Sequence, residues 1–149
     1  MIAARFTTGL LTSAVAAFIA GCGASAADPA ADTASAPPVE TLAPLYQQAL
    51  PNVADKTFTS AIVTFPPAAR AMPHRHGDAF VYAYVLEGTV NSQLEGEPAH
   101  VYHQGENWSE TPGAHHLATE NASATEPAKL LVVFISTTGE RLKVDDVRP

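Results

Sequence analysis

The stretch that decides how this chain of 149 residues is interpreted is 74–88, which reads HRHGDAFVYAYVLEG. Its second half is rich in Val, Tyr and Phe and ends in Glu87-Gly88, a composition typical of a β-strand that enters a tight turn. Its first half places His74 and His76 two residues apart, and in an extended segment such residues project to the same face. Two imidazoles on one face have the spacing of metal ligands.

The same pattern of short apolar runs continues on both sides of this stretch. Glycines at 88, 96, 105 and 113 recur every 8 or 9 residues, a spacing that suits short strands joined by tight turns and predicts an all-β sandwich or barrel. The predicted strands are 58–65, 80–86, 89–94, 99–103, 115–119 and 130–136. Since 80–86 and 130–135 are apolar on both faces, either barrel closure or a homodimer should cover the second face.

The composition excludes several classes of function. Lys and Arg number 8 against 15 Asp and Glu, a net charge of −7, and the basic residues are scattered, so no nucleic-acid partner is expected. The single Cys allows neither an intrachain disulfide nor a four-thiolate metal cluster within this chain. A metal would therefore have to bind through His, Asp, Glu or Gln. All six His lie between His74 and His116.

Two blocks of this sequence resemble the motifs of the cupin superfamily. The stretch 74–88 is similar to the first motif, in which HxH precedes a strand that ends in YVLEG. The stretch 105–121, GENWSETPGAHHLATEN, resembles the second motif, in which two glycines precede a metal-binding histidine, and Gly105, Gly113 and His116 fit that spacing. The resemblance implies a single double-stranded β-helix, a jelly-roll-like barrel with a metal near its axis.

The resemblance extends over residues 58–136 and implies a metal site. Carried over residue by residue, the ligands of a divalent metal (iron, manganese, nickel or zinc) are His74, His76 and His116. His115 is the competing third ligand if the strand register slips by one residue. Three imidazoles leave coordination positions open for water and a small-molecule ligand.

The sequence also departs from the cupin pattern. The glutamate of the first motif falls on Val81, which cannot bind a metal, and the glycine expected before HxH falls on Ala68. Asp78 or Glu110 is a candidate fourth ligand, against the alternative that each is a carboxylate of a turn or of the rim. Other candidates for the pocket are Tyr82 and Gln93, which lie on predicted strands, and Trp108.

Two functions of different classes fit this site. The first is a protein that binds a divalent metal and a small organic ligand without catalysis, and the missing carboxylate at Val81 favours it. The alternative is a metal-dependent enzyme with dioxygenase-like, isomerase-like or lyase-like chemistry on a small molecule. Because one fold supports many chemistries, the resemblance does not choose between them.

The N-terminal part predicts export. Residues 1–21 have a short basic start and an apolar run, the pattern of a signal peptide. Residues 19–22, IAGC, resemble a bacterial lipobox, which makes Cys22 the acylated first residue of a cell-envelope lipoprotein, attached to the membrane only through its lipid. Gly23 favours the outer membrane, on its periplasmic side. The alternative is cleavage after 24–26, which gives a soluble periplasmic or secreted protein.

The remaining domain boundaries follow from composition. Residues 22–44 are rich in Ala, Ser and Pro and are predicted to be a disordered linker. Residues 45–149 are predicted to form the cupin domain, and 45–50 could form a helical turn before Pro51.

Overall fold

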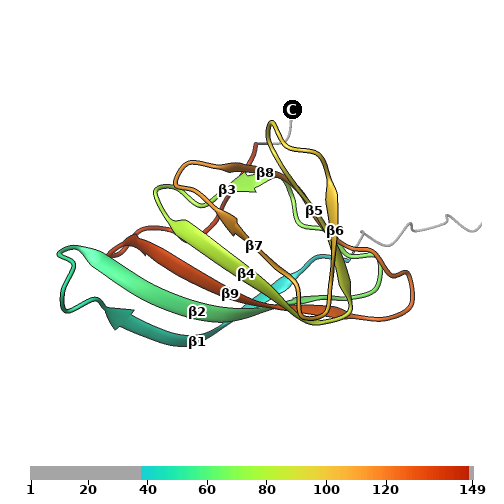
Figure 1. The fold of residues 1–149 in the computed structure, drawn as a ribbon, viewed down its shortest axis with the longest axis horizontal. Helices are drawn as coiled ribbons and strands as arrows, with labels where there is room; N and C mark the ends of the chain where they lie inside the picture. Colours follow the sequence, from blue (N-terminus) through green and yellow to red (C-terminus); the bar gives the residue numbers. More distant parts are fainter. Residues whose placement is uncertain (1–37, 148–149) are drawn as a thin grey trace, which may run out of the picture. The chain divides into compact units, whose positions relative to one another are not determined.

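The computed structural model describes residues 38–147, which form β-strands and no helix (Figure 1). The strands are β1 Thr41–Ala49, β2 Lys56–Phe65, β3 His74–Arg75, β4 Phe80–Glu87, β5 Thr89–Leu94, β6 His100–His103, β7 Asn107–Glu110, β8 His115–Asn121, β9 Ala128–Thr137 and β10 Val144–Asp145. The all-β prediction is confirmed. Within the described range, no helix has the length and apolar character needed to cross a membrane.

The strands form two antiparallel sheets of five strands each. One has the order β1-β2-β9-β4-β7 and the other β10-β3-β8-β5-β6. Burial alternates strictly along β2 and β9, so every second side chain of these strands faces the interior. The apolar residues on the other face of β4 and β9 are half-buried or exposed. The prediction that barrel closure or a homodimer covers a second apolar face therefore concerns this outer face of the sheet.

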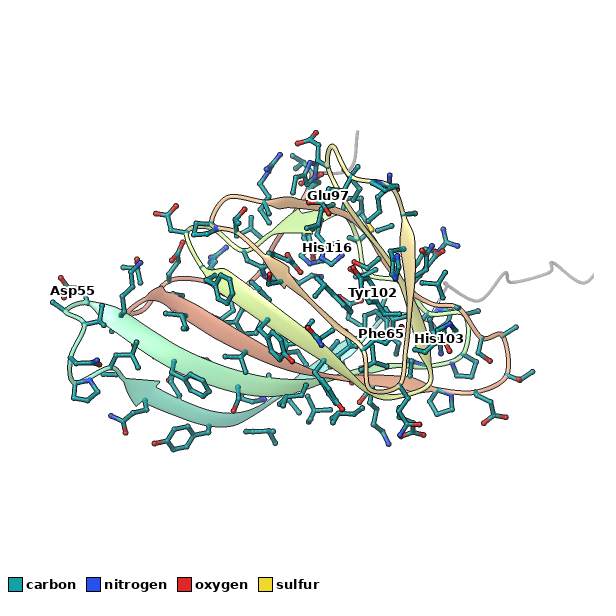
Figure 2. The ribbon with its side chains drawn as sticks, in the orientation of Figure 1. Asp55, Phe65, Glu97, Tyr102, His103 and His116 are labelled. Atoms are coloured by element: carbon teal, nitrogen blue, oxygen red, sulfur yellow. The ribbon has the colours of Figure 1, made fainter. Side chains whose placement is uncertain are left out.

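The core lies between the sheets. Phe65 and Phe134 are its largest fully buried side chains, and Val90 contributes to it from the opposite sheet. Figure 2 shows Phe65 and His116 in the interior, whereas Glu97 lies in the exposed turn between β5 and β6. The site described below is therefore built into the wall of an apolar core.

The turn after β4 requires its glycine. Gly88 has a φ of +77°, and a Cβ added there would lie 2.7 Å from the carbonyl oxygen of Pro127. The prediction that 87–88 ends a strand in a tight turn is confirmed, because β4 ends at Glu87 and β5 begins at Thr89.

Ala68 occupies the position where the cupin pattern has a glycine. Its φ is +57°, in the left-handed region that L-residues other than Gly, Asn and Asp rarely adopt. Its amide donates a hydrogen bond of 2.8 Å to the carbonyl of Ser123. The backbone therefore keeps a conformation that suits glycine although the side chain is a methyl group.

The helical turn expected at 45–50 is wrong. These residues belong to β1, which pairs antiparallel with β2 and shifts register between Pro44 and Tyr46. A helix of one or two turns gains little by itself, whereas the free edge of β2 offers a full row of backbone hydrogen bonds. β1 begins at Thr41, so ordered structure begins within the stretch 22–44 that was predicted to be linker.

The six predicted strands are present, with bounds that differ by at most two residues at either end. Four strands were not predicted: β1, β3, β7 and β10. β3 has two residues and β7 has four, which is too short for an apolar alternation to be recognised in the sequence. Both short strands carry residues of the site.

Candidate metal centre

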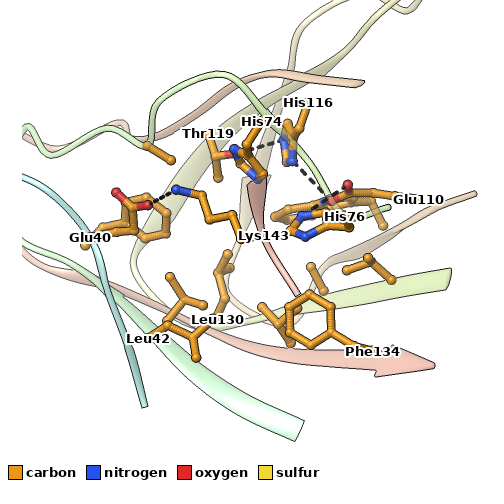
Figure 3. A pocket seen from close by; sticks show the side chains of 17 residues that line it. Glu40, Leu42, His74, His76, Glu110, His116, Thr119, Leu130, Phe134 and Lys143 are labelled. Atoms are coloured by element: carbon orange, nitrogen blue, oxygen red, sulfur yellow. Dashed lines mark hydrogen bonds and ion pairs between the residues drawn. The ribbon is translucent and has the colours of Figure 1, made fainter. Parts of the chain in front are cut away.

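The three histidines His74, His76 and His116 meet in the interior (Figure 3). β3 pairs with β8 so that His74 lies directly opposite His116, and the centroids of their rings are 5.1 Å apart. His74 and His76 face the same side, with ring centroids 4.8 Å apart. One ring nitrogen from each lies within 4.8 Å of the others, and all three side chains are buried.

Backbone carbonyls orient two of the three rings. Nδ1 of His74 donates a hydrogen bond of 2.7 Å to the carbonyl of Met72, and Nδ1 of His76 donates one to the carbonyl of Leu142. A carbonyl oxygen only accepts, so each Nδ1 carries the proton and each Nε2 keeps a lone pair. This arrangement is the one that protein ligands of metals use to fix a tautomer.

Two hydroxyl groups hold the third ring. Nε2 of His116 lies 2.8 Å from Oγ of Ser92 and 2.8 Å from Oγ1 of Thr119, and both hydroxyls are buried. When Nε2–H donates to these oxygens, the lone pair belongs to Nδ1. Nδ1 faces the carboxylate of Glu110, 3.1 Å from Oε1. A protonated Nδ1 would donate to that oxygen, whereas an unprotonated Nδ1 would offer its lone pair to a metal.

Burial keeps the first two imidazoles neutral. Desolvation lowers the pKa of His74 to about 4, despite its hydrogen bond to the carbonyl of Met72, and desolvation likewise lowers the pKa of His76. A neutral imidazole is the form that offers a lone pair to a metal, since a bound proton would occupy the same position. Both ligands are therefore available at neutral pH.

Glu110 is a buried carboxylate within this cluster. Only 2% of its surface is exposed, and Oε2 lies 3.6 Å from Nε2 of His76 while Nε1–H of Trp108 donates to Oε1 at 3.1 Å. Burial alone would raise the pKa of Glu110, but the hydrogen bond and charge of His116, with His76 and Trp108, lower it below its usual value. The interpretation of Glu110 as a rim carboxylate is wrong, because β7 turns this side chain inward.

The cluster lines a small apolar pocket (Figure 3). Its cavity volume is about 70 Å³, and most of its wall consists of aliphatic and aromatic side chains: Leu42, Val63, Phe65, Leu130, Val132 and Phe134. Lys143 and Glu40 lie at the same pocket and form an ion pair of 2.6 Å. The pocket therefore has room for a metal ion with a few waters or a small organic group.

Two predicted residues lie outside the pocket because of strand alternation. His115 lies on the face of β8 opposite to that of His116, and its Nε2 contacts Oδ2 of Asp146 at 2.8 Å. Tyr82 lies on the outer face of β4, between the buried Val81 and Ala83. The competing register with His115 as a ligand is wrong, and so is the placement of Tyr82 in the pocket.

Two more predicted residues are held elsewhere by local contacts. Asp78 is exposed in the turn after His76, and its backbone amide bonds to Oε1 of Glu140. Nε2 of Gln93 donates to the carbonyl of Glu97 at 3.3 Å within the β5–β6 hairpin. Neither lines the pocket of the histidine cluster, so the structure does not bring Asp78 or Gln93 to the candidate site.

Trp108 does line the pocket, as predicted. Its ring packs on Tyr102 with a centroid distance of 4.6 Å and meets His116 edge-on at 6.3 Å. Cys22, the predicted lipidation site, lies outside the described residues.

Four residues of the site were missed in the sequence: Ser92, Thr119, Glu40 and Lys143. Hydroxyl and charged residues of this kind occur throughout the chain. Only the register of β5 with β8 brings Ser92 opposite Thr119, and no local motif marks either one.

The donor set fits a divalent metal. Three imidazoles converge, their outward nitrogens are hydrogen-bonded to protein groups, and Oε2 of Glu110 is buried beside them without a hydrogen-bond partner. A bound cation between these side chains would give such a buried polar atom a partner. His74, His76 and His116 would hold such a metal.

Two facing antiparallel sheets around a buried histidine cluster define a β-barrel with a candidate metal site. Residues 61–134 match the family model described as the cupin domain, so this part of the chain is a cupin domain and the resemblance of its motifs is confirmed. No curated protein matches the chain in sequence.

Solved structures with a similar fold include the cupin domain of Cnp3 from Schizosaccharomyces pombe (14% identity, TM-score 0.56, 66% of this chain and 62% of that one). They also include the DMSP lyase DddQ from Ruegeria pomeroyi DSS-3 (23% identity, TM-score 0.52, 62% of this chain and 44% of that one). A recombinant oxalate oxidase in complex with glycolate is similar as well (21% identity, TM-score 0.58, 74% of this chain and 57% of that one). The chain thus covers less than two thirds of each, and the likeness shows the fold.

Proposed function

We propose that this protein binds one divalent metal ion through His74, His76 and His116 and holds a small organic ligand beside it, outside the cytoplasm. The observation that carries the proposal is the fixed orientation of the three rings, each bound on its outward nitrogen. If the three histidines were only core residues, nothing would require their inward nitrogens to converge on one point.

The ligand we propose is small and largely apolar. The pocket wall next to the histidines is aliphatic and aromatic, which favours a carbon body over a polyhydroxylated or highly charged molecule. Lys143 is the one lysine among the described residues that line this pocket, and its ammonium group is already paired with Glu40 and Asp145. A polar end of the ligand would meet the metal site.

A metal-dependent enzyme is the second candidate. A metal here would supply Lewis acidity or, with iron or manganese, a redox centre. Glu110 favours this candidate, since it is a buried carboxylate in reach of two of the histidines and could hold or move a proton. Oxygen uptake and product formation across a panel of small acids and alcohols, with the H116A variant as a control, would distinguish an enzyme from a binding protein.

Metal analysis tests the main proposal. We expect about one metal ion per chain in purified full-length protein and in the H100A variant, in which an exposed histidine is removed. H74A and H116A should each lose the metal while keeping the β-sheet circular dichroism spectrum. Equal metal content in all four proteins would refute the site.

We further propose that the protein is an exported lipoprotein with Cys22 as its acylated residue, on the basis of the IAGC sequence. Labelling with palmitate that is lost in the C22A variant and blocked by globomycin would support this location. A soluble mature form that begins near Ala27 would support the alternative of ordinary signal cleavage.

Dimerisation through the outer face of β4 and β9 remains part of the proposal. Phe80 and Leu86 are 39% and 38% exposed on this sheet, a degree of exposure that a second copy of the chain would remove. Light scattering on the purified protein should give the mass of a dimer, and the mass of a single chain would contradict the prediction.

A further inference from the structure

Val81 and Glu110 occupy facing positions on neighbouring strands. β4 pairs with β7 so that Val81 is the direct partner of Glu110. Both side chains are directed inward, with 1% and 2% of their surfaces exposed, and both line the metal pocket. In the cupin pattern described above, the carboxylate of the first motif belongs at the position of Val81. At the pocket, β4 therefore carries no carboxylate, whereas the neighbouring strand β7 carries one.

The surroundings of Glu110 lack a fixed positive charge. Its ion-pair partners among the described residues are His76 and His116 alone, with no Lys or Arg in contact. The indole N–H of Trp108 satisfies Oε1, whereas Oε2 has no hydrogen-bond partner. Burying a carboxylate under these conditions is unfavourable unless a cation accompanies it.

We propose that Glu110 is the fourth protein ligand of the metal, so that β7 supplies the carboxylate that β4 lacks. This inference rests on the proposed metal site and specifies its composition as three imidazoles and one carboxylate. Side chains directly opposite each other in an antiparallel pair have Cβ atoms about 5 Å apart, a displacement that the length of a glutamate side chain can span. The carboxylate then reaches the same region of the pocket from the adjacent strand.

The fourth ligand predicts which cations bind. A carboxylate beside imidazoles suits divalent ions that accept both oxygen and nitrogen, such as manganese and iron, more than ions that prefer thiolates. The carboxylate also lowers the combined charge of the ion and its ligands from +2 to +1, which reduces the cost of burying the ion. Manganese is therefore a suitable ion for measuring affinity, and cobalt is a suitable ion for observing the site through its visible spectrum.

The main experiment is a titration of chelator-stripped full-length protein with Mn²⁺ and Co²⁺. We expect E110Q, which keeps the shape of the side chain and removes its charge, to weaken Mn²⁺ binding at least about tenfold and to change the visible spectrum of bound Co²⁺. E97Q, which changes an exposed glutamate, serves as the matched control and should bind as the wild type does. Mn²⁺ affinity of E110Q within about twofold of the wild type would overturn the inference.

A relocation variant tests the geometric part of the inference. V81E/E110V moves the carboxylate back to β4, and we expect it to bind Mn²⁺ more tightly than E110V alone. An infrared difference spectrum between metal-bound and metal-free wild-type protein requires no substitution, and a shifted carboxylate band that E110Q lacks is the expected result. The absence of any carboxylate shift in the wild type would overturn the inference even if the variants failed to fold.

The H116A variant separates the two levels of the proposal. If H116A loses Mn²⁺ while E110Q retains full affinity, the histidine site stands and Glu110 is only an ion-pair partner of His116. If H116A and E110Q both bind as the wild type does, the metal site itself is refuted.

Discussion

The two hydroxyl groups behind His116 offer a sharp test of how the site is organised. Ser92 and Thr119 each lie 2.8 Å from Nε2 of His116, so two acceptors share one N–H group. Removing both, in S92A/T119V, leaves that N–H buried with no partner. The expected loss is about 1–3 kcal/mol in the unfolding free energy of the metal-free protein, the usual penalty for an unsatisfied buried donor.

Metal binding should respond to the same change. Without a hydroxyl to hold the proton on Nε2, the lone pair of His116 is no longer fixed on Nδ1, and we expect metal affinity to fall by about 10–100-fold. Each single variant keeps one acceptor at the same distance, so S92A and T119V should each show much less than half of the combined effect. This non-additivity is the specific signature of a shared donor.

Urea unfolding and metal titration are the two assays. Trp108 is the sole tryptophan of the chain and lies 6.3 Å from the ring of His116, so its fluorescence reports on unfolding close to the site. Ser109→Ala, at an exposed position on β7, is the control and should leave both quantities unchanged. If the double variant unfolds at the wild-type urea concentration and binds the metal with wild-type affinity, the role assigned to the two hydroxyls is wrong.

Three further predictions concern the stability of the fold, each measured by urea unfolding. In metal-free protein the pKa of His74 is lowered to about 4 from 6.5, so the unfolded chain takes up a proton first as the pH falls. The contribution of this side chain to stability is fully present above pH 6.5 and is lost between 6.5 and about 4, a change of up to about 3 kcal/mol that H74Q should reduce. G88A should destabilise the protein by about 2 kcal/mol or more, because its Cβ would meet the carbonyl oxygen of Pro127 at 2.7 Å and its φ is +77°. A68G should instead stabilise it by about 1 kcal/mol, since an exposed alanine with a φ of +57° is strained, and a loss of stability would contradict that explanation.

The strands and the histidine pair could be predicted because their signals are local. The run of Val, Tyr and Phe in 80–86 and the glycine at 88 are properties of a few adjacent residues, and β4 has nearly the predicted bounds. The i, i+2 spacing of His74 and His76 likewise follows from an extended backbone, and both are buried while Arg75 between them is exposed. His116 required the second motif in addition, because its distance from His74 along the chain says nothing of their pairing.

The errors have a common physical cause. β1 forms because β2 has a free edge, which is a property of the sheet and leaves no periodic pattern in 41–49. β7 is a four-residue strand whose inward side chains are an aromatic residue and a glutamate, so it does not display the apolar alternation of a buried strand. Local patterns therefore suggested a helical turn in part of β1 and indicated no strand at β7, and tertiary pairing decided both segments.

The position of Glu110 illustrates why a ligand set cannot be read from sequence motifs alone. A motif specifies which residue of one strand faces the metal. The wall of a barrel also contains the neighbouring strand, and each residue of the first strand has a paired residue on the second that faces the same side. Val81 and Glu110 are 29 residues apart in the chain but are direct partners in the sheet. An apolar residue at a motif position is thus weak grounds for concluding that a carboxylate is missing, because the pairing of β4 with β7 returns one to the same wall of the pocket.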